Sequence, residues 1–273
     1  MKIFVNFFLT LLLIQGLNTQ ASNENIVSIT GHPDYPPVIW HSKKDDKLKG
    51  IAVEATETFL KELDYKVKNR PIATWARSLK EVSEGNVDII LPPYLTKPRE
   101  KQYLYPQTPF MMDETVLFIR KGSNLKFTKL SDLRAYKGAA IINDSFGDEF
   151  DQYNRKVLKI KRLTKTEQCF RFLLKGRTDY VVAGKSAGIA VMAQMGVDDK
   201  IQIHSRPVIQ TGMYLGASLK SKKNINKIIE HFEKRTLQWK KEGKFKELEE
   251  KYFRLYLKEN APNKSTANYL SSQ

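Results

Sequence analysis

Arg99 lies in a segment that is suited to binding an anionic group. Gly85 follows a helix-like stretch, an apolar run occupies 87–91, and Pro92-Pro93 end that run before the loop that carries Arg99. Helix, glycine, apolar run and prolines in this order are typical of an α/β unit. Ligands of open α/β sheets bind beyond the carboxyl ends of the strands, and a guanidinium holds a carboxylate through two parallel hydrogen bonds. Arg99 is therefore a candidate carboxylate-binding residue; the alternative is an ordinary solvated cation.

Sequence signatures of catalysis and metal binding are absent. The chain contains no Gly-x-Ser-x-Gly elbow, no Gly-rich phosphate loop followed by Lys-Ser/Thr, and no His-Glu-x-x-His pair. Its histidines are scattered, and only His32 with Asp34 brings two metal-binding side chains close together. The single cysteine, Cys169, shares a helical face with three apolar neighbours, which predicts a buried core thiol. We expect no metal, no cofactor and no internal disulfide.

The first residues have the features of a cleavable secretory signal. Lys2 precedes an apolar core at 3–14 that is too short to span a bilayer, and Ala21 ends a Thr-Gln-Ala sequence of the kind that a signal peptidase reads. We predict a signal peptide at 1–21, cleavage after Ala21, a mature protein in the periplasm and no membrane insertion after cleavage; the alternative is an uncleaved anchor. The formal net charge is +16, but basic and acidic residues are interspersed. Because the chain is exported, nucleic acid is not an expected partner.

Strands and helices alternate along the mature chain. Two successive α/β sets are each followed by a β-rich run, at 114–120 and 208–217. This alternation predicts parallel or mixed sheets that are covered by helices on both faces. From 222 to 253 the pattern is helical, with a break at Gly243.

Several segments together resemble the extracytoplasmic solute-binding proteins of the polar amino-acid type, family 3. The resemblance rests on the segments 31–37, 49–54, 88–110 with its Thr-x-x-Arg and Pro-x-x-Pro-Phe, 130–138 and 243–253, in the family's order, and it covers nearly the whole mature chain. It implies an α/β, periplasmic-binding-protein-like bilobal fold, in which two α/β lobes joined by two hinge strands close on a ligand.

The resemblance also implies the limits of the lobes. Lobe 1 is expected to be discontinuous, at 22–115 and 212–256, and lobe 2 to occupy 116–211. The segment 257–273 is polar and has little to bury, so we expect a flexible tail there.

Matching positions imply the ligand-binding residues. Arg99 corresponds to the arginine that grips the ligand's carboxylate, and Tyr35 and Trp75 correspond to aromatic residues that sandwich the ligand. The turn at 145–147 corresponds to one whose backbone N–H groups face an anion. The complete set of expected ligand contacts is Tyr35, Trp75, Arg77, Tyr94, Arg99, Ser145, Phe146, Gly147 and Lys185.

One departure bears on the ligand. The family's amino-acid binders carry an aspartate in lobe 2 that pairs with the ligand's ammonium group, and this chain has Gly184 at that position. A buried ammonium group without a counter-charge is costly, so an ordinary α-amino acid is less expected unless Asp34 or Asp148 substitutes. Arg77 and Lys185 add positive charge, which favours an anionic ligand. On this reasoning, Gly184→Asp is expected to create amino-acid binding.

The predicted function is capture of a small polar, carboxylate-bearing solute in an interlobe cleft by a monomeric exported protein. Its partner would be an ABC permease or a membrane sensor, and the sequence leaves uptake and sensing open. Two alternatives remain. One is a dehydratase that acts in the same cleft, with Asp148 or Glu149 as its acid, and the other is an interaction protein with a degenerate cleft.

Overall fold

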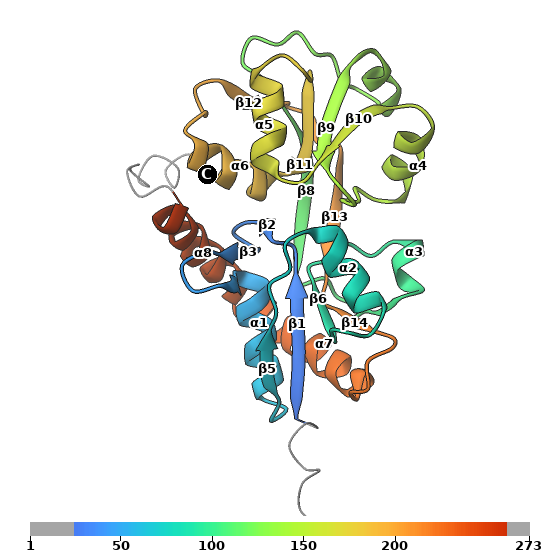
Figure 1. The fold of residues 1–273 in the computed structure, drawn as a ribbon, viewed down its shortest axis with the longest axis vertical. Coiled ribbons are helices and arrows are strands. Elements are labelled where there is room, and N and C mark those ends of the chain that lie inside the picture. Colours follow the sequence, from blue (N-terminus) through green and yellow to red (C-terminus); the bar gives the residue numbers. More distant parts are fainter. Residues whose placement is uncertain (1–24, 261–273) are drawn as a thin grey trace, which may run out of the picture.

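Two α/β lobes lie one above the other along the long axis of the molecule (Figure 1). This computed structural model describes residues 25–260. The predicted signal peptide and its cleavage site fall outside the described residues. No helix within 25–260 is long and apolar enough to cross a membrane.

The lower lobe in Figure 1 is built on a five-stranded sheet in the order β5-β1-β6-β14-β7. Strands β5, β1 and β6 are parallel, so their carboxyl ends meet at the edge that faces the other lobe, whereas β14 is antiparallel to both of its neighbours. A three-stranded sheet, β2-β3-β4, flanks it. The strands are β1 (Ile26–Gly31), β2 (Asp34–Tyr35), β3 (Ile39–Ser42), β4 (Lys47–Lys49), β5 (Lys66–Asn69), β6 (Ile89–Leu91), β7 (Tyr103–Leu104) and β14 (Gly216–Ser218).

Helices cover both faces of this sheet. On one face, Phe59 of α1 packs against Phe232 and Trp239 of α7, with ring centroids 5.7 and 4.7 Å apart. On the other face, α2 packs through Trp75 and Val82 against the apolar strand residues. The helices of this lobe are α1 (Ile51–Lys61), α2 (Trp75–Ser83), the short α3 (Lys97–Glu100), α7 (Ile225–Lys241) and α8 (Lys244–Asn260).

The upper lobe contains a second mixed sheet in the order β10-β9-β11-β8-β12, with β13 paired to β8. Successive side chains of a strand point to opposite faces, so alternate residues of β8 pack into two different cores. Phe118 packs with Cys169 of α5 in one core, and Leu117 packs with Phe150 of α4 in the other. Cys169 is fully buried, as predicted. The elements are β8 (Met111–Arg120), η1 (Leu130–Ala135), β9 (Lys137–Ile141), α4 (Asp148–Lys156), β10 (Lys159–Leu163), α5 (Thr166–Leu174), β11 (Tyr180–Gly184), α6 (Lys185–Met195), β12 (Ile201–Ile203) and β13 (Ile209–Met213).

Strands β8 and β13 form the connection between the lobes. They are antiparallel, with Met111 opposite Met213 and Asp113 opposite Thr211, and they pass from one lobe to the other (Figure 1). The bilobal fold with two hinge strands is therefore present. The β-rich run at 208–217 divides into β13 and β14, which belong to different sheets.

The prediction of a flexible tail from residue 257 is wrong for its first four residues. Helix α8 continues to Asn260, and Leu257 is buried with Phe253 and Tyr256 against α6 of the upper lobe. These three residues extend the apolar stripe of the helix, and the polar composition after Lys258 concealed this continuation. The predicted break at Gly243 does separate α7 from α8. The exact lobe limits remain a prediction.

Candidate functional site

A cavity lies between the lobes, beyond the carboxyl ends of β1, β6 and β9. It contains about 320 Å³ of free space, including the part open to solvent. In an α/β sheet this edge is where ligands are expected. We call it the inner cavity, and its lining residues are His32, Tyr35, Trp75, Pro92, Tyr94, Arg99, Asp144, Ser145 and Phe146.

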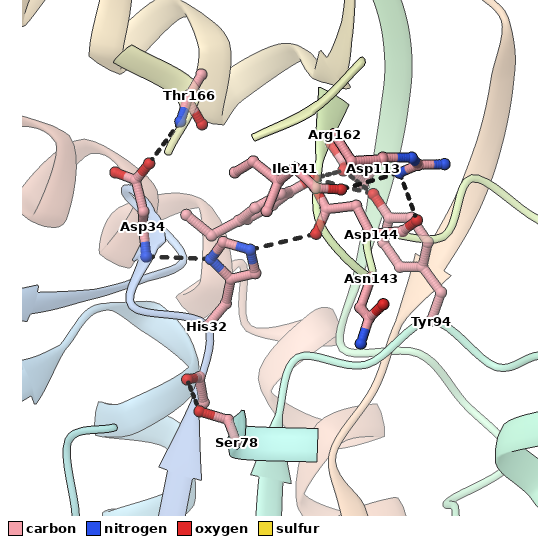
Figure 2. Close-up of polar contacts among 12 residues, drawn as sticks. His32, Asp34, Ser78, Tyr94, Asp113, Ile141, Asn143, Asp144, Arg162 and Thr166 are labelled. Atoms are coloured by element: carbon pink, nitrogen blue, oxygen red, sulfur yellow. Dashed lines mark hydrogen bonds and ion pairs between the residues drawn. The ribbon is translucent and has the colours of Figure 1, made fainter. Parts of the chain in front are cut away.

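Helices α2 and α3 of the lower lobe supply Trp75 and Arg99. Thr74 caps α2 by accepting a hydrogen bond from the Arg77 N–H at 3.3 Å. Ser78 connects the helix to the end of β1 by donating a 2.9 Å hydrogen bond to the Gly31 carbonyl (Figure 2). The guanidinium of Arg99 lies 5.6 Å from the centroid of the Trp75 ring. Such a stack orients the guanidinium plane while leaving its N–H groups available.

Arg99 reaches across the gap without meeting a carboxylate. Its Nη1 donates to the Tyr94 carbonyl and its Nη2 to the Asn143 carbonyl of the other lobe, both at 3.3 Å. Asn143 has a φ of 64°, a left-handed conformation that asparagine tolerates, and it turns the chain just after β9. Within residues 25–260, no acidic side chain forms an ion pair with Arg99. The guanidinium therefore retains unused charge at the cavity.

The upper lobe contributes the loop between β9 and α4. Arg162 of β10 donates to the carbonyls of Ile141 and Asp144 at 2.9 and 3.1 Å, and its guanidinium lies 5.9 Å from the Phe146 ring (Figure 2). These contacts fix the loop in place. As a result, Asp144 and Phe146 face the lower lobe.

Besides the contact of Arg99 with Asn143, two polar contacts join the lobes near the cavity, as Figure 2 shows. His32 Nε2 lies 3.3 Å from Asp144 Oδ1, and Asp34 Oδ2 accepts the N–H of Thr166, the first residue of α5, at 2.9 Å. Nδ1 of His32 accepts the Asp34 N–H at 3.0 Å, so a neutral ring carries its proton on Nε2 and donates it to Asp144. The structure is therefore the closed form of the clamp.

A buried cluster of Asp113, Tyr35 and Tyr94 lies behind the cavity. Both tyrosine hydroxyls donate to Asp113 Oδ2, and the two hydroxyl oxygens are 2.9 Å apart. Asp113 is 4 % exposed, and this burial raises the pKa of its carboxyl, although the tyrosine hydrogen bonds act in the opposite direction. Burial, followed by the charge of Asp113, raises the pKa of each tyrosine well above its usual value. The hydroxyls therefore stay protonated.

Gly184 lies against this cluster and has no room for a side chain. A Cβ there would be 1.9 Å from the Tyr35 hydroxyl oxygen and 2.4 Å from Asp113 Oδ2. An aspartate at position 184 would therefore have to displace Tyr35 and Asp113, because the hinge carboxylate of Asp113 already occupies that space. Asp34 is engaged with α5, so it is not free to substitute either.

The cavity brings six of the nine predicted contact residues together and leaves out three. Arg77 is on the solvent side of α2, with its side chain 70 % exposed and paired with Glu81 at 3.8 Å. Lys185 pairs with Glu114 at 3.5 Å. Gly147 faces β13, since a Cβ there would lie 3.0 Å from Ile209. The six lining residues from the predicted set are Tyr35, Trp75, Tyr94, Arg99, Ser145 and Phe146.

Two of the three N–H groups of the turn at 145–147 are occupied by acceptors in the same lobe. The Phe146 N–H donates to Asp151 Oδ1 at 3.0 Å, and the Gly147 N–H lies 3.4 Å from Ser145 Oγ. Asp151 lies in the first turn of α4, where a carboxylate is well placed to accept these donors. Within the expected anion-binding turn, the Phe146 and Gly147 N–H groups are thus satisfied by acceptors of their own lobe.

Sequence reasoning did not assign His32, Asp144 and Asp113 to the ligand site. His32 follows β1 directly and Asp144 lies in the loop just after β9, and this position after parallel strands was the signal that could have identified them. Asp113 has no such signal, because its role depends on the pairing of β8 with β13.

The two candidate acids of the dehydratase alternative lie outside the inner cavity. Glu149 borders a different hollow with Arg206, whereas Asp148 lies on the outer groove that leads to the inner cavity. This outer groove has about 1430 Å³ of free space between α2 and α3 on one side and α4 on the other. In residues 25–260, His32 and Asp34 belong to no metal-binding cluster of histidine, cysteine and carboxylate side chains.

Residues 27–255 match the bacterial extracellular solute-binding proteins, family 3, and the chain belongs to this family. This match confirms the resemblance seen in the sequence. No curated protein matches the chain.

Solved structures with the same fold include both transport and sensor proteins. A mutant of ArgBP from T. maritima is 21 % identical, with a TM-score of 0.69 over 84 % of this chain and 96 % of that one. A histidine kinase sensor domain with similarity to periplasmic binding proteins is 18 % identical, with a TM-score of 0.70 over 84 % and 96 %. The substrate binding protein of an amino acid ABC transporter is 18 % identical, with a TM-score of 0.67 over 84 % and 99 %. At these identities the likeness establishes the bilobal fold.

Proposed function

We propose that this protein is an exported solute-binding protein that captures a small polar, carboxylate-bearing solute in the inner cavity. The observation that carries the proposal is Arg99, a guanidinium that faces the cavity without a carboxylate partner among the described residues. Its stacking on Trp75 supports a fixed binding geometry. A solute that contacts both lobes stabilises the closed form in proportion to its differential contacts.

The captured solute would be delivered in the periplasm either to an ABC permease or to a membrane sensor. Both uses occur among proteins of this fold, in an amino acid ABC transporter and in a histidine kinase. The protein acts as a monomer, since each chain carries both lobes of the clamp. The outer groove allows a solute longer than a single amino acid, such as a short peptide or a cell-wall fragment.

The test is a thermal-shift screen of amino acids, dicarboxylates and muropeptides, followed by calorimetric titration of the compounds that raise the melting temperature. Arg99→Ala is expected to cost about 2–5 kcal/mol of binding free energy, because it leaves a carboxylate unpaired in a desolvated cavity. Arg77→Ala is the matched control, because Arg77 lies nearby on the solvent side of α2. An Arg99→Ala variant that binds as tightly as the Arg77→Ala control would refute the proposal.

The same titration addresses the enzymatic alternative. Binding without turnover of a prephenate-like substrate is the expected result, because neither Asp148 nor Glu149 lines the inner cavity. Conversion of the prephenate-like substrate into product by the purified protein would instead favour a dehydratase.

A further inference from the structure

Helix α8 contacts both lobes. It begins in the lower lobe, where Phe245 and Leu248 are buried in the core, and its last turns lie beside α6 of the upper lobe (Figure 1). The lobes are therefore joined here as well as through the hinge strands and around the inner cavity. The cluster that joins them is buried and largely apolar, and we call it the α6–α8 contact. Its members are Trp40 of β3, Phe253, Tyr256 and Leu257 of α8, and Ala190 and Ala193 of α6.

Polar contacts fix the second half of α8 to the lower lobe. Tyr252 donates a 2.5 Å hydrogen bond to Glu54 of α1. Close to the end of the helix, Glu259 accepts hydrogen bonds from Lys49 Nζ at 2.7 Å and from Trp40 Nε1 at 3.4 Å. Because these partners belong to α1, β3 and β4, α8 has to move with the lower lobe when the lobes separate.

Helix α6 is fixed to the upper lobe in a similar way. Its Val191 and Met192 are buried in the same core as Phe118 of β8, and a Cβ on Gly188 would lie 2.1 Å from the Phe118 ring. This face of the helix therefore packs directly on the hinge strand β8. The opposite face carries small side chains three positions apart, which share one side of a helix and turn towards the lower lobe: Ala187, Ala190 and Ala193.

The α6–α8 contact lies away from the hinge, so it does not survive a rotation of the lobes. Helix α6 starts directly after Gly184, which lies against the hinge residue Asp113, and Ala193 is in the third turn of the helix, about 13 Å further along. A rotation of the upper lobe about β8 and β13 either separates α6 from α8 or drives one helix into the other, and packed interiors do not compress. Either movement ends the contact, so the contact stabilises the closed form.

The apolar part of this contact opposes opening more strongly than the polar contacts near the cavity. When the lobes separate, His32 and Asp144 can exchange their interlobe contact for water at a small net cost. The buried side chains of Trp40, Tyr256 and Leu257 are only 2–3 % exposed, and opening would bring them into water. Exposure of buried apolar surface is unfavourable in proportion to its area.

Two hydrogen bonds between side chains cross the same place. The Tyr256 hydroxyl donates to Gln194 Oε1 of α6, and the Ser186 hydroxyl of α6 donates to Glu249 Oε1 of α8 at 3.4 Å. They fix the position of one helix along the other. Gln194 also offers a way to weaken the contact from the upper lobe without altering α8.

We propose that α8 holds the two lobes closed before any solute arrives. The inference goes beyond the proposed function, and its test uses no ligand, so its failure leaves the proposed function intact. A solute then enters and leaves only while the lobes are open. Because the α6–α8 contact is present with and without a solute, it slows both steps together and changes the dissociation constant less than either rate.

The experiment measures the distance between the lobes in the free protein. Lys80→Cys on α2 and Arg155→Cys on α4 place spin labels on opposite sides of the outer groove, where both side chains are exposed; Cys169 is buried and does not take a label. Pulsed electron paramagnetic resonance gives the distribution of label distances, and small-angle X-ray scattering of the unlabelled protein gives the radius of gyration. Thermal unfolding shows that each variant is folded.

The variants weaken the contact from each lobe in turn. Leu257→Ala removes an apolar side chain of α8, and Gln194→Ala removes the acceptor of the Tyr256 hydroxyl on α6. Leu60→Ala is the matched control, because Leu60 is a fully buried leucine in the last turn of α1, within the lower-lobe core. It should lose stability without a change in the position of the lobes.

We expect one short label distance in the free wild type and in Leu60→Ala, with the radius of gyration of the closed form. Leu257→Ala should raise the ratio of open to closed protein about tenfold or more, which adds a longer distance and enlarges the radius. Gln194→Ala should produce a smaller shift in the same direction, and it decides the matter if Leu257→Ala does not fold. A free wild type in which the longer distance dominates overturns the inference. Leu257→Ala and Gln194→Ala proteins with the distances of the Leu60→Ala control overturn it as well.

Discussion

Gly184→Ala is predicted to destabilise the protein through one local clash. The φ of Gly184 is −61°, which any residue adopts, so an alanine there introduces no backbone strain. Its Cβ would lie 1.9 Å from the Tyr35 hydroxyl oxygen and 2.4 Å from Asp113 Oδ2. Because ordinary contacts between such atoms are near 3.5 Å, the two groups would have to move by about 1.1–1.6 Å.

The structure sets the size of this effect. Tyr35 and Asp113 are 9 % and 4 % exposed, so neither can move into solvent. Overpacking of this kind costs about 1–3 kcal/mol. Loosening the hydrogen bonds to a buried carboxylate adds about 1–3 kcal/mol. A total of about 2–6 kcal/mol corresponds to a melting temperature lowered by roughly 4–24 °C for a chain of this size.

Calorimetry of Gly184→Ala, Tyr35→Phe and the double variant tests this reasoning. Tyr35→Phe removes the hydroxyl oxygen that the new methyl group would contact. The double variant should therefore lose about 1 kcal/mol or more less unfolding free energy than the losses of the two single variants added together. A Gly184→Ala protein that melts within about 1 °C of the wild type would refute the clash. Strictly additive effects in the double variant would show that Tyr35 is not the group it meets.

Three further predictions concern closure, pH and reactivity. Asp34→Ala removes the hydrogen bond by which the lower lobe caps α5, a contact worth about 0.5–2 kcal/mol, so the ligand-free protein should open. Small-angle X-ray scattering should then give a larger radius of gyration than for the wild type. An unchanged radius contradicts the role of this contact. Burial raises the folded-state pKa of Asp113 above its ordinary value of 3.8, so the folded protein holds that proton more tightly and the wild type loses stability as the pH rises from about 4 to the folded-state pKa. Urea unfolding should therefore show that the free energy of unfolding of Asp113→Asn rises relative to that of the wild type across that pH range. A difference that changes in the opposite direction as the pH rises would contradict the raised pKa. Burial also raises the pKa of the Cys169 thiol to about 12, so Ellman's reagent should leave native protein unmodified at pH 8 and titrate one thiol in denaturant; rapid native labelling would show that α5 opens locally.

The fold and part of the site follow from local patterns in the sequence. Alternating strands and helices predict two α/β sets, and a loop that follows a strand places Arg99 at the ligand edge of a sheet. Helix geometry could also have excluded Arg77, because a residue two positions after the inward-facing Trp75 lies about 200° around the helix. The structure bears this out, since Arg77 pairs with Glu81 in solvent.

Other parts of the site depend on contacts between distant segments. The position of Asp113 behind Tyr35 and Tyr94 results from the register of β8 with β13 and β11, which a single sequence does not reveal. Likewise, the closing contact of His32 with Asp144 joins residues more than 100 positions apart. The absence of an aspartate at Gly184 looked like a loss of charge, but packing shows that a carboxylate from another strand fills the same space.

The most direct test of interlobe capture is a crystal structure of the protein with the tightest compound from the ligand screen. The expected result is electron density among Trp75, Tyr94 and Arg99, with a carboxylate of the compound paired to both nitrogens of the guanidinium. A compound bound elsewhere, or an Arg99 side chain turned into bulk solvent while the cavity is filled, would contradict the account.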